Sequence, residues 1–178
     1  MSRQEPTVIR PEKPSDREAI RAVLALAFAD QAPPGSVPVE PELVDRLRAT
    51  RDWLPQLALV AERDGVVVAF VACTRGGIGD RSALGLGPIG VLPEWQRHGV
   101  GASLIRAEIE LADSAGYPLI AVLGDPAYYG RFGFVPAQTL GIEPPALDWA
   151  EHFQVLPLSC FSTAIRGTFR YPRPFMEL

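Results

Sequence analysis

The sequence predicts a mixed α/β (α+β) fold, in which helices flank a central β-sheet, and three observations lead to this class. Two apolar runs, 57–61 and 66–73, flank Asp64-Gly65, which is a strong signal for an antiparallel hairpin. An amphipathic helix is expected over 101–115, ended by a glycine. Apolar segments precede and follow that helix, so a strand, helix and strand crossover with parallel pairing is expected. Antiparallel and parallel pairs in one sheet make the predicted sheet mixed.

The elements before the hairpin are shorter. Residues 8–10 are expected to form the first strand. Ser15 and Glu18 have the spacing of a capping box, and apolar residues follow at helical spacing, which predicts a helix of about 14 residues. A Pro-rich lobe over about 30–50 then interrupts the pattern, with a short helix near its end, and we interpret it as a loop-rich lobe over a binding face.

The elements after the hairpin complete the predicted sheet. A Gly-rich loop is expected at 76–79, and a strand at 83–91 whose alternation shifts by one residue at Gly87-Pro88, which predicts a bulge or kink. The remaining expected elements are a strand covered on both faces at 119–123, a short helix at about 126–132, and strands near 134–135 and 153–164. An amphipathic tail at about 166–178 is expected either to fold over the body or to meet a partner subunit.

Composition narrows the class of protein. A chain of 178 residues with 47% hydrophobic residues predicts a single domain, 1–178, with a core large enough to fold without a metal or disulfide. The longest apolar run has only about eight residues, against the roughly 20 that cross a bilayer, and no apolar signal segment opens the chain. Together with two cysteines, expected to be inert in the core, this predicts a cytoplasmic protein without membrane contact. The net charge of −4 disfavours nucleic-acid binding, and two histidines without CxxC or HExxH spacing predict no metal site.

The segment 96–101 carries the strongest indication of chemistry. It joins the strand that ends at Val91 to a long helix, whose first N–H groups lack intrahelical partners and lie at the positive end of the helix dipole. Such a position is suited to phosphate, and Gly99 and Gly101 remove Cβ atoms where a bulky anion must approach. Arg97 adds a cation, so a ligand with a diphosphate is expected. The plain alternative is a loop that caps the helix and binds nothing.

Two motifs about 30 residues apart resemble those of one family. Residues 96–101, following 91–93, resemble the Q/R-x-x-G-x-G/A motif of the GNAT superfamily of acyl-CoA-dependent N-acyltransferases. Tyr129 followed by Gly133-Phe134 resembles that family's Y-x-x-x-G-F segment, and the string 123–134 is similar to its YhbS-like branch. The resemblance covers roughly residues 7–165.

The resemblance implies a GNAT-like mixed, splayed central sheet with acetyl-CoA (coenzyme A) held between the strand ending at Val91 and the strand at 119–123. The implied cofactor contacts lie in two segments: Ile89, Gly90 and Val91, which would pair with the pantetheine arm, and Gln96, Arg97, His98, Gly99, Val100, Gly101 and Ala102, which would bind the pyrophosphate. The implied reaction is direct acetyl transfer to a primary amine of a small molecule or peptide.

The catalytic groups follow from the same resemblance. Tyr129 corresponds to the general acid that protonates the leaving thiolate. Many family members place a Glu on the strand before the loop, but 83–91 contains no acid, and the Asn that many relatives carry before the short helix is also missing. The candidates for the base are therefore three carboxylates and an imidazole: Asp80, Glu94, Asp125 and His98. Asp125 has a structural alternative, as the N-cap of the short helix.

Three functions remain open from the sequence. The leading one is an N-acetyltransferase. The alternative, favoured by the missing strand acid, is a non-catalytic CoA-binding module or sensor, and the third is a structural or interaction protein. We expect the lobe at 31–47, the loop at 75–80 and the C-terminal strands to bind the acceptor. Acidic residues in these segments indicate a cationic acceptor. A homodimer is implied only by the family.

Overall fold

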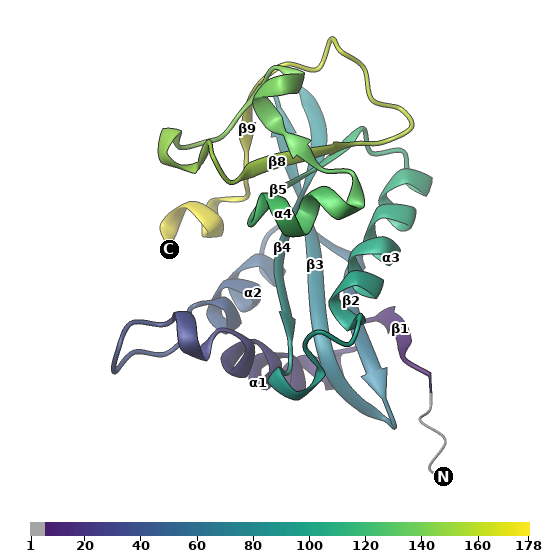
Figure 1. Cartoon of the computed structure of the whole chain (residues 1–178), viewed down its shortest axis with the longest axis vertical. Coiled ribbons are helices and arrows are strands. Elements are labelled where there is room, and N and C mark those ends of the chain that lie inside the picture. Colours follow the sequence, from purple (N-terminus) through teal and green to yellow (C-terminus); the bar gives the residue numbers. More distant parts are fainter. Residues whose placement is uncertain (1–5) are drawn as a thin grey trace.

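The computed structural model describes residues 6–178 (Figure 1). Residues 1–5, for which the sequence predicts no signal segment, lie outside the described residues. The strands are β1 (Val8–Pro11), β2 (Trp53–Arg63), β3 (Val66–Ile78), β4 (Arg81–Val91), β5 (Leu119–Leu123), β6 (Val135–Pro136), β7 (Ile142–Glu143), β8 (Phe153–Pro157) and β9 (Gly167–Arg170). The main order is β1-β2-β3-β4-β5-β8-β6, in which only β4 and β5 pair in parallel. The predicted mixed sheet is confirmed.

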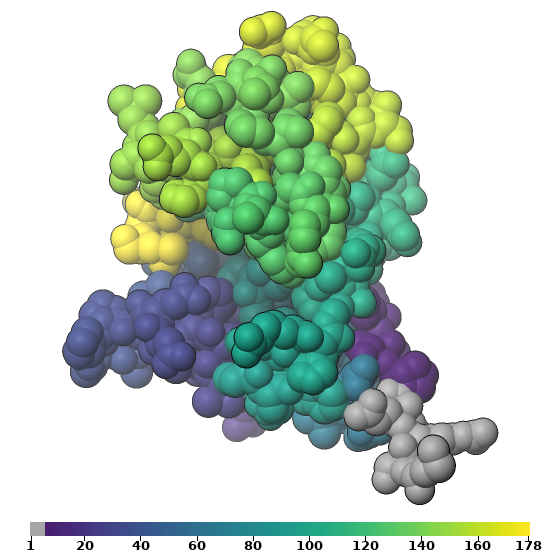
Figure 2. Space-filling model, in the orientation of Figure 1, coloured from purple at the N-terminus to yellow at the C-terminus, as the bar shows by residue number. Residues whose placement is uncertain are grey.

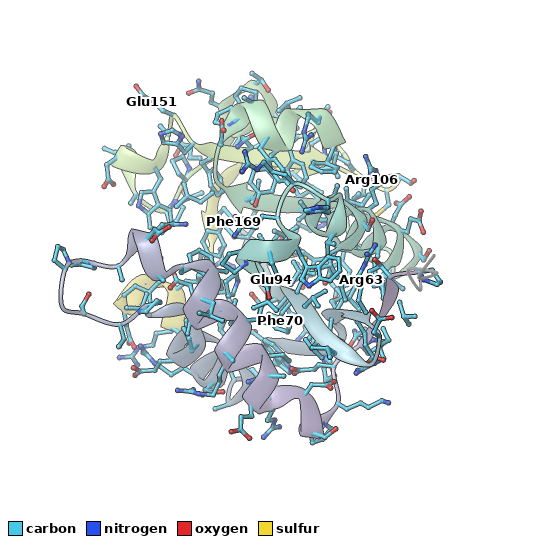
Figure 3. All side chains as sticks on the ribbon, turned by 60° about the horizontal axis from the view of Figure 1, so that its bottom comes forward. Arg63, Phe70, Glu94, Arg106, Glu151 and Phe169 are labelled. Atoms are coloured by element: carbon cyan, nitrogen blue, oxygen red, sulfur yellow. The ribbon has the colours of Figure 1, made fainter. Side chains whose placement is uncertain are left out.

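Helices cover both faces of this sheet. The helices are α1 (Arg17–Ala27), α2 (Glu40–Arg48), α3 (Val100–Ser114) and α4 (Pro126–Tyr129), with 3-10 turns η2 (Ala29–Gln31), η3 (Pro93–Trp95), η4 (Gly130–Phe132), η6 (Leu147–Trp149) and η7 (Arg173–Glu177) among the connections. Side chains of β2 alternate between two cores: Leu57 and Leu59 pack with α3, whereas Ala58 and Val60 pack with α1. Phe70 of β3 lies in the α1 core (Figure 3). Within residues 6–178, no helix combines the length and apolar character that crossing a bilayer requires.

Local turn chemistry sets the hairpin and the bend of β4. Asp64 (φ 50°) and Gly65 (φ 76°) both adopt the left-handed conformation that a tight two-residue turn needs, which confirms the predicted β2–β3 hairpin. The Gly87-Pro88 peptide bond is cis, and the β3–β4 register shifts at this point, between the partners of Val71 and Cys73. The predicted irregularity inside the strand is therefore confirmed.

The sheet opens beyond this bend. β5 pairs with β4 only where Leu84–Leu86 meets Ile120–Val122. β4 then continues to Val91 with β3 as its single partner, while the chain after β5 turns into α4. The edge of β4 at Ile89–Val91 consequently faces a gap rather than a strand, which is the splay that the resemblance implies.

Three sequence predictions about element bounds are corrected. Gly76 and Gly77 lie inside β3, not in a loop, because β9 crosses β3 there and a Cβ at Gly76 would come within 2.6 Å of the backbone oxygen of Arg170. The helix α1 has 11 residues and no Ser15–Glu18 capping box, since the Asp16 carboxylate instead accepts the Lys13 N–H at 2.7 Å.

The third correction is β8, which ends at Pro157 because the next residues form a turn, in which the Phe161 N–H donates to the carbonyl of Leu158 at 3.0 Å. Cys160, expected in the core, lies exposed in this turn with its Sγ 3.1 Å from the Gly116 carbonyl oxygen, whereas Cys73 is buried as expected.

The C-terminal tail folds back over the body. Its strand β9 pairs with β3, and η7 packs beside α2, where Arg46 forms an ion pair with Glu177. Figure 1 shows this yellow segment next to α2. We call α1, η2, α2 and the chain between them (residues 17–48) the N-terminal lobe. Segments from opposite ends of the chain thus enclose the space below the opened sheet.

Candidate active site

The loop between β4 and α3 is held in an unusual conformation by its own polar groups. Arg97 (φ 60°) and Gly99 (φ 79°) both have left-handed backbones. The Gln96 side-chain amide donates to the carbonyl of Val91 at 3.1 Å, and the His98 Nδ1 lies 2.8 Å from the Gln96 carbonyl oxygen. These hydrogen bonds fix the short loop that joins the end of β4 to the start of α3.

No side chain caps the first backbone N–H groups of α3. Its first backward bond is from the Ser103 N–H to the Gly99 carbonyl, at 3.0 Å, so the N–H groups of 100–102 precede it. This first turn contains no acidic residue, and its N-cap has no side-chain cap. The positive end of the helix is thus left for an anion from outside the chain.

A cavity of about 740 Å³ lies in front of these amides, and we call it the donor cavity. Its lining comes from the β4–α3 loop and from α4: Val91, Trp95, Gln96, Arg97, Gly99, Gly101, Ala102, Asp125, Ala127, Tyr128 and Arg131. A Cβ at Gly101 would stand 3.2 Å from the Tyr128 hydroxyl and narrow the cavity. Free amides, two arginines and a glycine at the point of closest approach fit the pyrophosphate of coenzyme A.

A smaller cavity of about 230 Å³ continues along the free edge of β4. Ile89, Gly90 and Val91 form one side, and Phe28 and Gln31 of the N-terminal lobe form the other. Because no strand of the described chain pairs with this edge, its main-chain groups are open to a ligand that lies along it. The three residues predicted to contact the pantetheine arm therefore line this cavity, and the contact itself stays a prediction.

A third cavity, about 660 Å³, lies at the inner end of the same cleft, and we call it the acceptor cavity. Its lining is largely apolar and aromatic: Phe28, Gln31, Glu40, Leu43, Leu86, Gly87, Pro88, Ile89, Val122, Leu123, Gly124, Asp125, Tyr129, Trp149, Tyr171, Phe175, Met176 and Leu178. It shares Ile89 with the small cavity and Asp125 with the donor cavity. The hollow that Figure 2 shows between the green residues of α4 and the teal residues around η3 belongs to the donor cavity, which Trp95 and Tyr128 line.

Tyr129 lines the acceptor cavity, together with Asp125, which also lines the donor cavity. It is only 8% exposed, and its ring packs edge-on against Tyr128 and Phe134, with centroid distances of 5.1 and 5.6 Å. The ring also covers Gly124, where a Cβ would lie 2.4 Å from Cε2, so a larger residue at that position would displace the ring. Burial raises the pKa of the Tyr129 hydroxyl above its ordinary value, which keeps the hydroxyl protonated at neutral pH.

The predicted carboxylates occupy different places. Asp125 is the N-cap of α4, as its structural alternative predicts, and its Oδ1 accepts the Ala127 N–H at 2.9 Å. It also lines both large cavities, so the capping role and a role in the cleft are compatible. Glu94 is exposed on η3, beside the β2–β3 hairpin where Arg63 lies over the Trp95 ring (Figure 3), and it lines none of the three cavities.

The remaining predicted cofactor residues are placed as follows. Gln96, Arg97, Gly99, Gly101 and Ala102 line the donor cavity. His98 and Val100 do not line any of the three cavities. The His98 ring is hydrogen-bonded to the Gln96 carbonyl, and the Val100 side chain is buried in the core that α3 covers. Asp80 and the loop at 75–80 also lie outside the cavities.

Several residues of the acceptor cavity were missed by sequence reasoning. Trp149, Tyr171 and Phe175 come from η6 and the tail, and Tyr171 contacts both others, with ring centroids 6.1 and 5.0 Å apart. The buried Gln154 donates to the Gly124 carbonyl at 3.0 Å and so holds the residue on which Tyr129 rests. The one signal was the density of aromatic residues in the Pro-rich tail.

Comparison with known proteins agrees with this geometry. A family model described as an acetyltransferase (GNAT) domain matches residues 55–136. The N-acetyltransferase YhbS of Escherichia coli is 33% identical over 130 residues, which are 71% of this chain and 72% of that protein, and YjhQ of the same organism is 36% identical over 126 residues, 68% and 66% of the two chains.

Two crystal structures are similar over nearly the whole chain. A GNAT family acetyltransferase from Brucella melitensis, in complex with acetyl-CoA, is 36% identical, with a TM-score of 0.77 and coverage of 95% of this chain and 97% of that one. YhbS from Escherichia coli, in complex with CoA, is 27% identical, with a TM-score of 0.86 and coverage of 98% and 96%. The motifs, the splayed sheet and these relatives lead to one conclusion: the chain belongs to the GNAT family of N-acetyltransferases.

Proposed function

We propose that this chain transfers an acetyl group from acetyl-CoA directly to a primary amine. The observation that carries the proposal is the continuity of the cleft: helix N-terminal amides, a free strand edge and a buried tyrosine follow one another along β4. Acetyl-CoA supplies an activated thioester, so that a nitrogen–carbon bond forms as the carbon–sulfur bond breaks. The relatives crystallised with acetyl-CoA and CoA support this choice of donor.

The donor would be bound by backbone rather than by many side chains. The amides of 99–102 would receive the pyrophosphate, and Arg97 and Arg131 would add charge-assisted bonds to it. The main chain of Ile89–Val91 would pair with the pantetheine amides as an added strand does. This arrangement would place the thioester at the inner end of the cleft, beside Tyr129.

Three proton transfers accompany the reaction: one proton reaches the sulfur from Tyr129 and two leave the acceptor nitrogen. Tyr129 regains its proton from water, so one proton is released overall. The Tyr129 hydroxyl, which burial keeps protonated at neutral pH, would donate its proton to the departing thiolate sulfur. The acceptor must lose a proton from its ammonium group before attack and another from nitrogen afterwards. Asp125, whose Oδ1 caps α4, would direct these protons to water through its second oxygen.

Replacement of Tyr129 tests the proposal. Tyr129→Phe should lower kcat by roughly a hundredfold, because a general acid contributes about 10²–10⁴-fold, and should leave the KM for acetyl-CoA within about twofold. Tyr117→Phe is the matched control, since Tyr117 lies at the end of α3 outside the cavities. Thermal stabilisation by CoA should persist in both variants. Unchanged kcat in Tyr129→Phe would remove the proposed acid.

A second candidate function is a non-catalytic CoA-binding module. It is favoured by one observation, the absence of any acid on β4 beside the proposed thioester position. Thermal stabilisation by acetyl-CoA without thiol release, across a panel of amines, would support this alternative. The cytoplasmic location, the single domain and the homodimer stay predictions.

A further inference from the structure

The two ends of the cleft differ in charge, and this difference bears on the acceptor. Arg97 and Arg131 line the donor cavity. The 18 residues that line the acceptor cavity include no Lys, Arg or His, and its two charged side chains are Glu40 and Asp125. The cavity therefore complements a cation and offers no counter-ion to a carboxylate or phosphate on the acceptor.

The walls of the acceptor cavity are mainly apolar. Phe28 and Leu43 come from the N-terminal lobe, and Trp149, Tyr171 and Phe175 come from the other side. With about 660 Å³ of space, this is the size and character of a site that encloses a small apolar body and orients it with a few polar groups. Only Glu40, Asp125 and a few amide and hydroxyl groups could serve as those polar contacts, too few for a polyol or a polyamine.

The rim of the cavity continues the apolar surface. Val39 is 50% exposed beside Glu40, Leu147 is 92% exposed beside Trp149, and Met176 is 47% exposed in η7. The Arg46–Glu177 ion pair connects the tail that carries Met176 to α2, so the tail and the N-terminal lobe are in direct contact. In Figure 1 the yellow η7 lies beside the lobe that carries α2.

We propose that the acceptor is a small primary amine carried on a single apolar group of about aromatic size, with one positive charge and no carboxylate. This inference rests on the proposed acetyl transfer and adds the chemical class of its substrate. The ammonium group would lie toward Asp125 and Tyr129, and the apolar body would lie against Phe175 and Trp149. The transferred group, the bonds made and the protons moved are those of the proposed reaction.

A matched set of acceptors tests the class. Phenethylamine should be acetylated with a kcat/KM at least roughly tenfold above that of phenylalanine, which adds only a carboxylate, and above that of spermidine, which lacks an apolar body. Products are identified by mass and thiol release is followed from acetyl-CoA. A preference for phenylalanine, for spermidine or for a peptide with an apolar first residue would overturn the inference.

Two variants locate the discrimination. Phe175→Ala should raise the KM for phenethylamine roughly tenfold and leave the KM for acetyl-CoA unchanged, because Phe175 lines only the acceptor cavity. Glu40→Gln should raise the amine KM about two- to threefold, because Glu40 is the second of the two negative side chains in a cavity proposed to hold one positive charge; an unchanged or lower amine KM would count against a cationic acceptor. Leu26→Ala, an equally apolar residue exposed on α1 outside the cavities, should change neither constant.

Binding separates failure of this inference from failure of the proposed function. Calorimetric titration of phenethylamine into the CoA-loaded protein should show a complex that Phe175→Ala weakens. No such complex, together with Tyr129-dependent acetylation of another amine class, would refute the substrate class and keep the acetyltransferase. No stabilisation by acetyl-CoA and no acetylation of any amine would refute the proposed function itself.

Discussion

The carboxyl group of Glu108 should make the stability of this protein fall as the pH rises. Glu108 lies on α3 with no solvent exposure, and neither carboxyl oxygen has a hydrogen-bond partner in the described chain. Burial raises the pKa of this group well above its ordinary 4.5, and the neighbouring Cys73 thiol offsets only part of that effect. The folded protein therefore keeps a neutral acid in its core, because a buried charge without a partner would be far more costly.

The direction follows from the protons bound in each state. Below pH 4.5 the carboxyl of Glu108 is protonated in both the folded and the unfolded chain, so this group favours neither state. Above pH 4.5 the unfolded chain releases the proton and the folded chain retains it, so the free energy of unfolding decreases. The limiting slope is about 1.4 kcal/mol per pH unit. Between pH 5 and 7 the loss reaches about 2–3 kcal/mol when the buried group keeps its proton over this range.

Urea unfolding at pH 5, 6 and 7 measures this loss. Glu108→Gln keeps the shape of the side chain and cannot ionise, so its free energy of unfolding relative to the natural chain should grow by about 2–3 kcal/mol from pH 5 to 7. Glu110→Gln removes an exposed carboxylate from the same helix and serves as the matched control, with a pH dependence like that of the natural chain. Parallel curves for the natural chain and Glu108→Gln would refute the reasoning, because they would mean that the group is solvated or paired in the folded state.

Three further predictions concern the cleft and the core. Gly101→Val should abolish thermal stabilisation by CoA, with little change in the melting temperature of the free protein, because its side chain would extend toward Tyr128 across the donor cavity. Gly124→Ala should lower kcat at least roughly tenfold by displacing the Tyr129 ring, while a CoA-induced shift in melting temperature persists; full activity would show that the ring can move freely. Thr74→Val should be neutral or stabilising by up to about 1 kcal/mol in urea unfolding, since the buried hydroxyl has no hydrogen-bond partner among residues 6–178, and a clear loss of stability would contradict this.

The donor half of the site could be predicted because its determinants are local. The loop at 96–101 joins an apolar strand to an amphipathic helix within a few residues, and Gly99 takes the left-handed conformation for which glycine is suited. The hairpin at Asp64-Gly65 was predicted for the same reason, since turn chemistry over two residues determines the pairing of both strands. The N-cap role of Asp125 is another local signal that the structure confirms.

Features that depend on distant contacts could not be predicted. Gly76 and Gly77 form part of β3 because β9, about 90 residues later, passes close to them, and no nearby residue indicates this. Glu108 shares a helical face with Leu104 and Ala112, but a carboxylate is ordinarily assigned to the solvent side of a helix. Its four-residue spacing from two buried residues was the available signal.

Membership of the family predicts the donor half of the cleft better than it predicts the acceptor half. The donor half is built from one continuous loop, one strand edge and α4, so a sequence that preserves the motif preserves the geometry. The acceptor half is assembled from the N-terminal lobe, β4, β5, η6 and the tail, and the family model ends at residue 136, before Trp149, Tyr171 and Phe175. Substitutions in the tail can therefore change the acceptor while the donor site stays the same. For this reason the chemistry of the acceptor has to be argued from the assembled cavity of each chain, as its charge and its aromatic walls allow here.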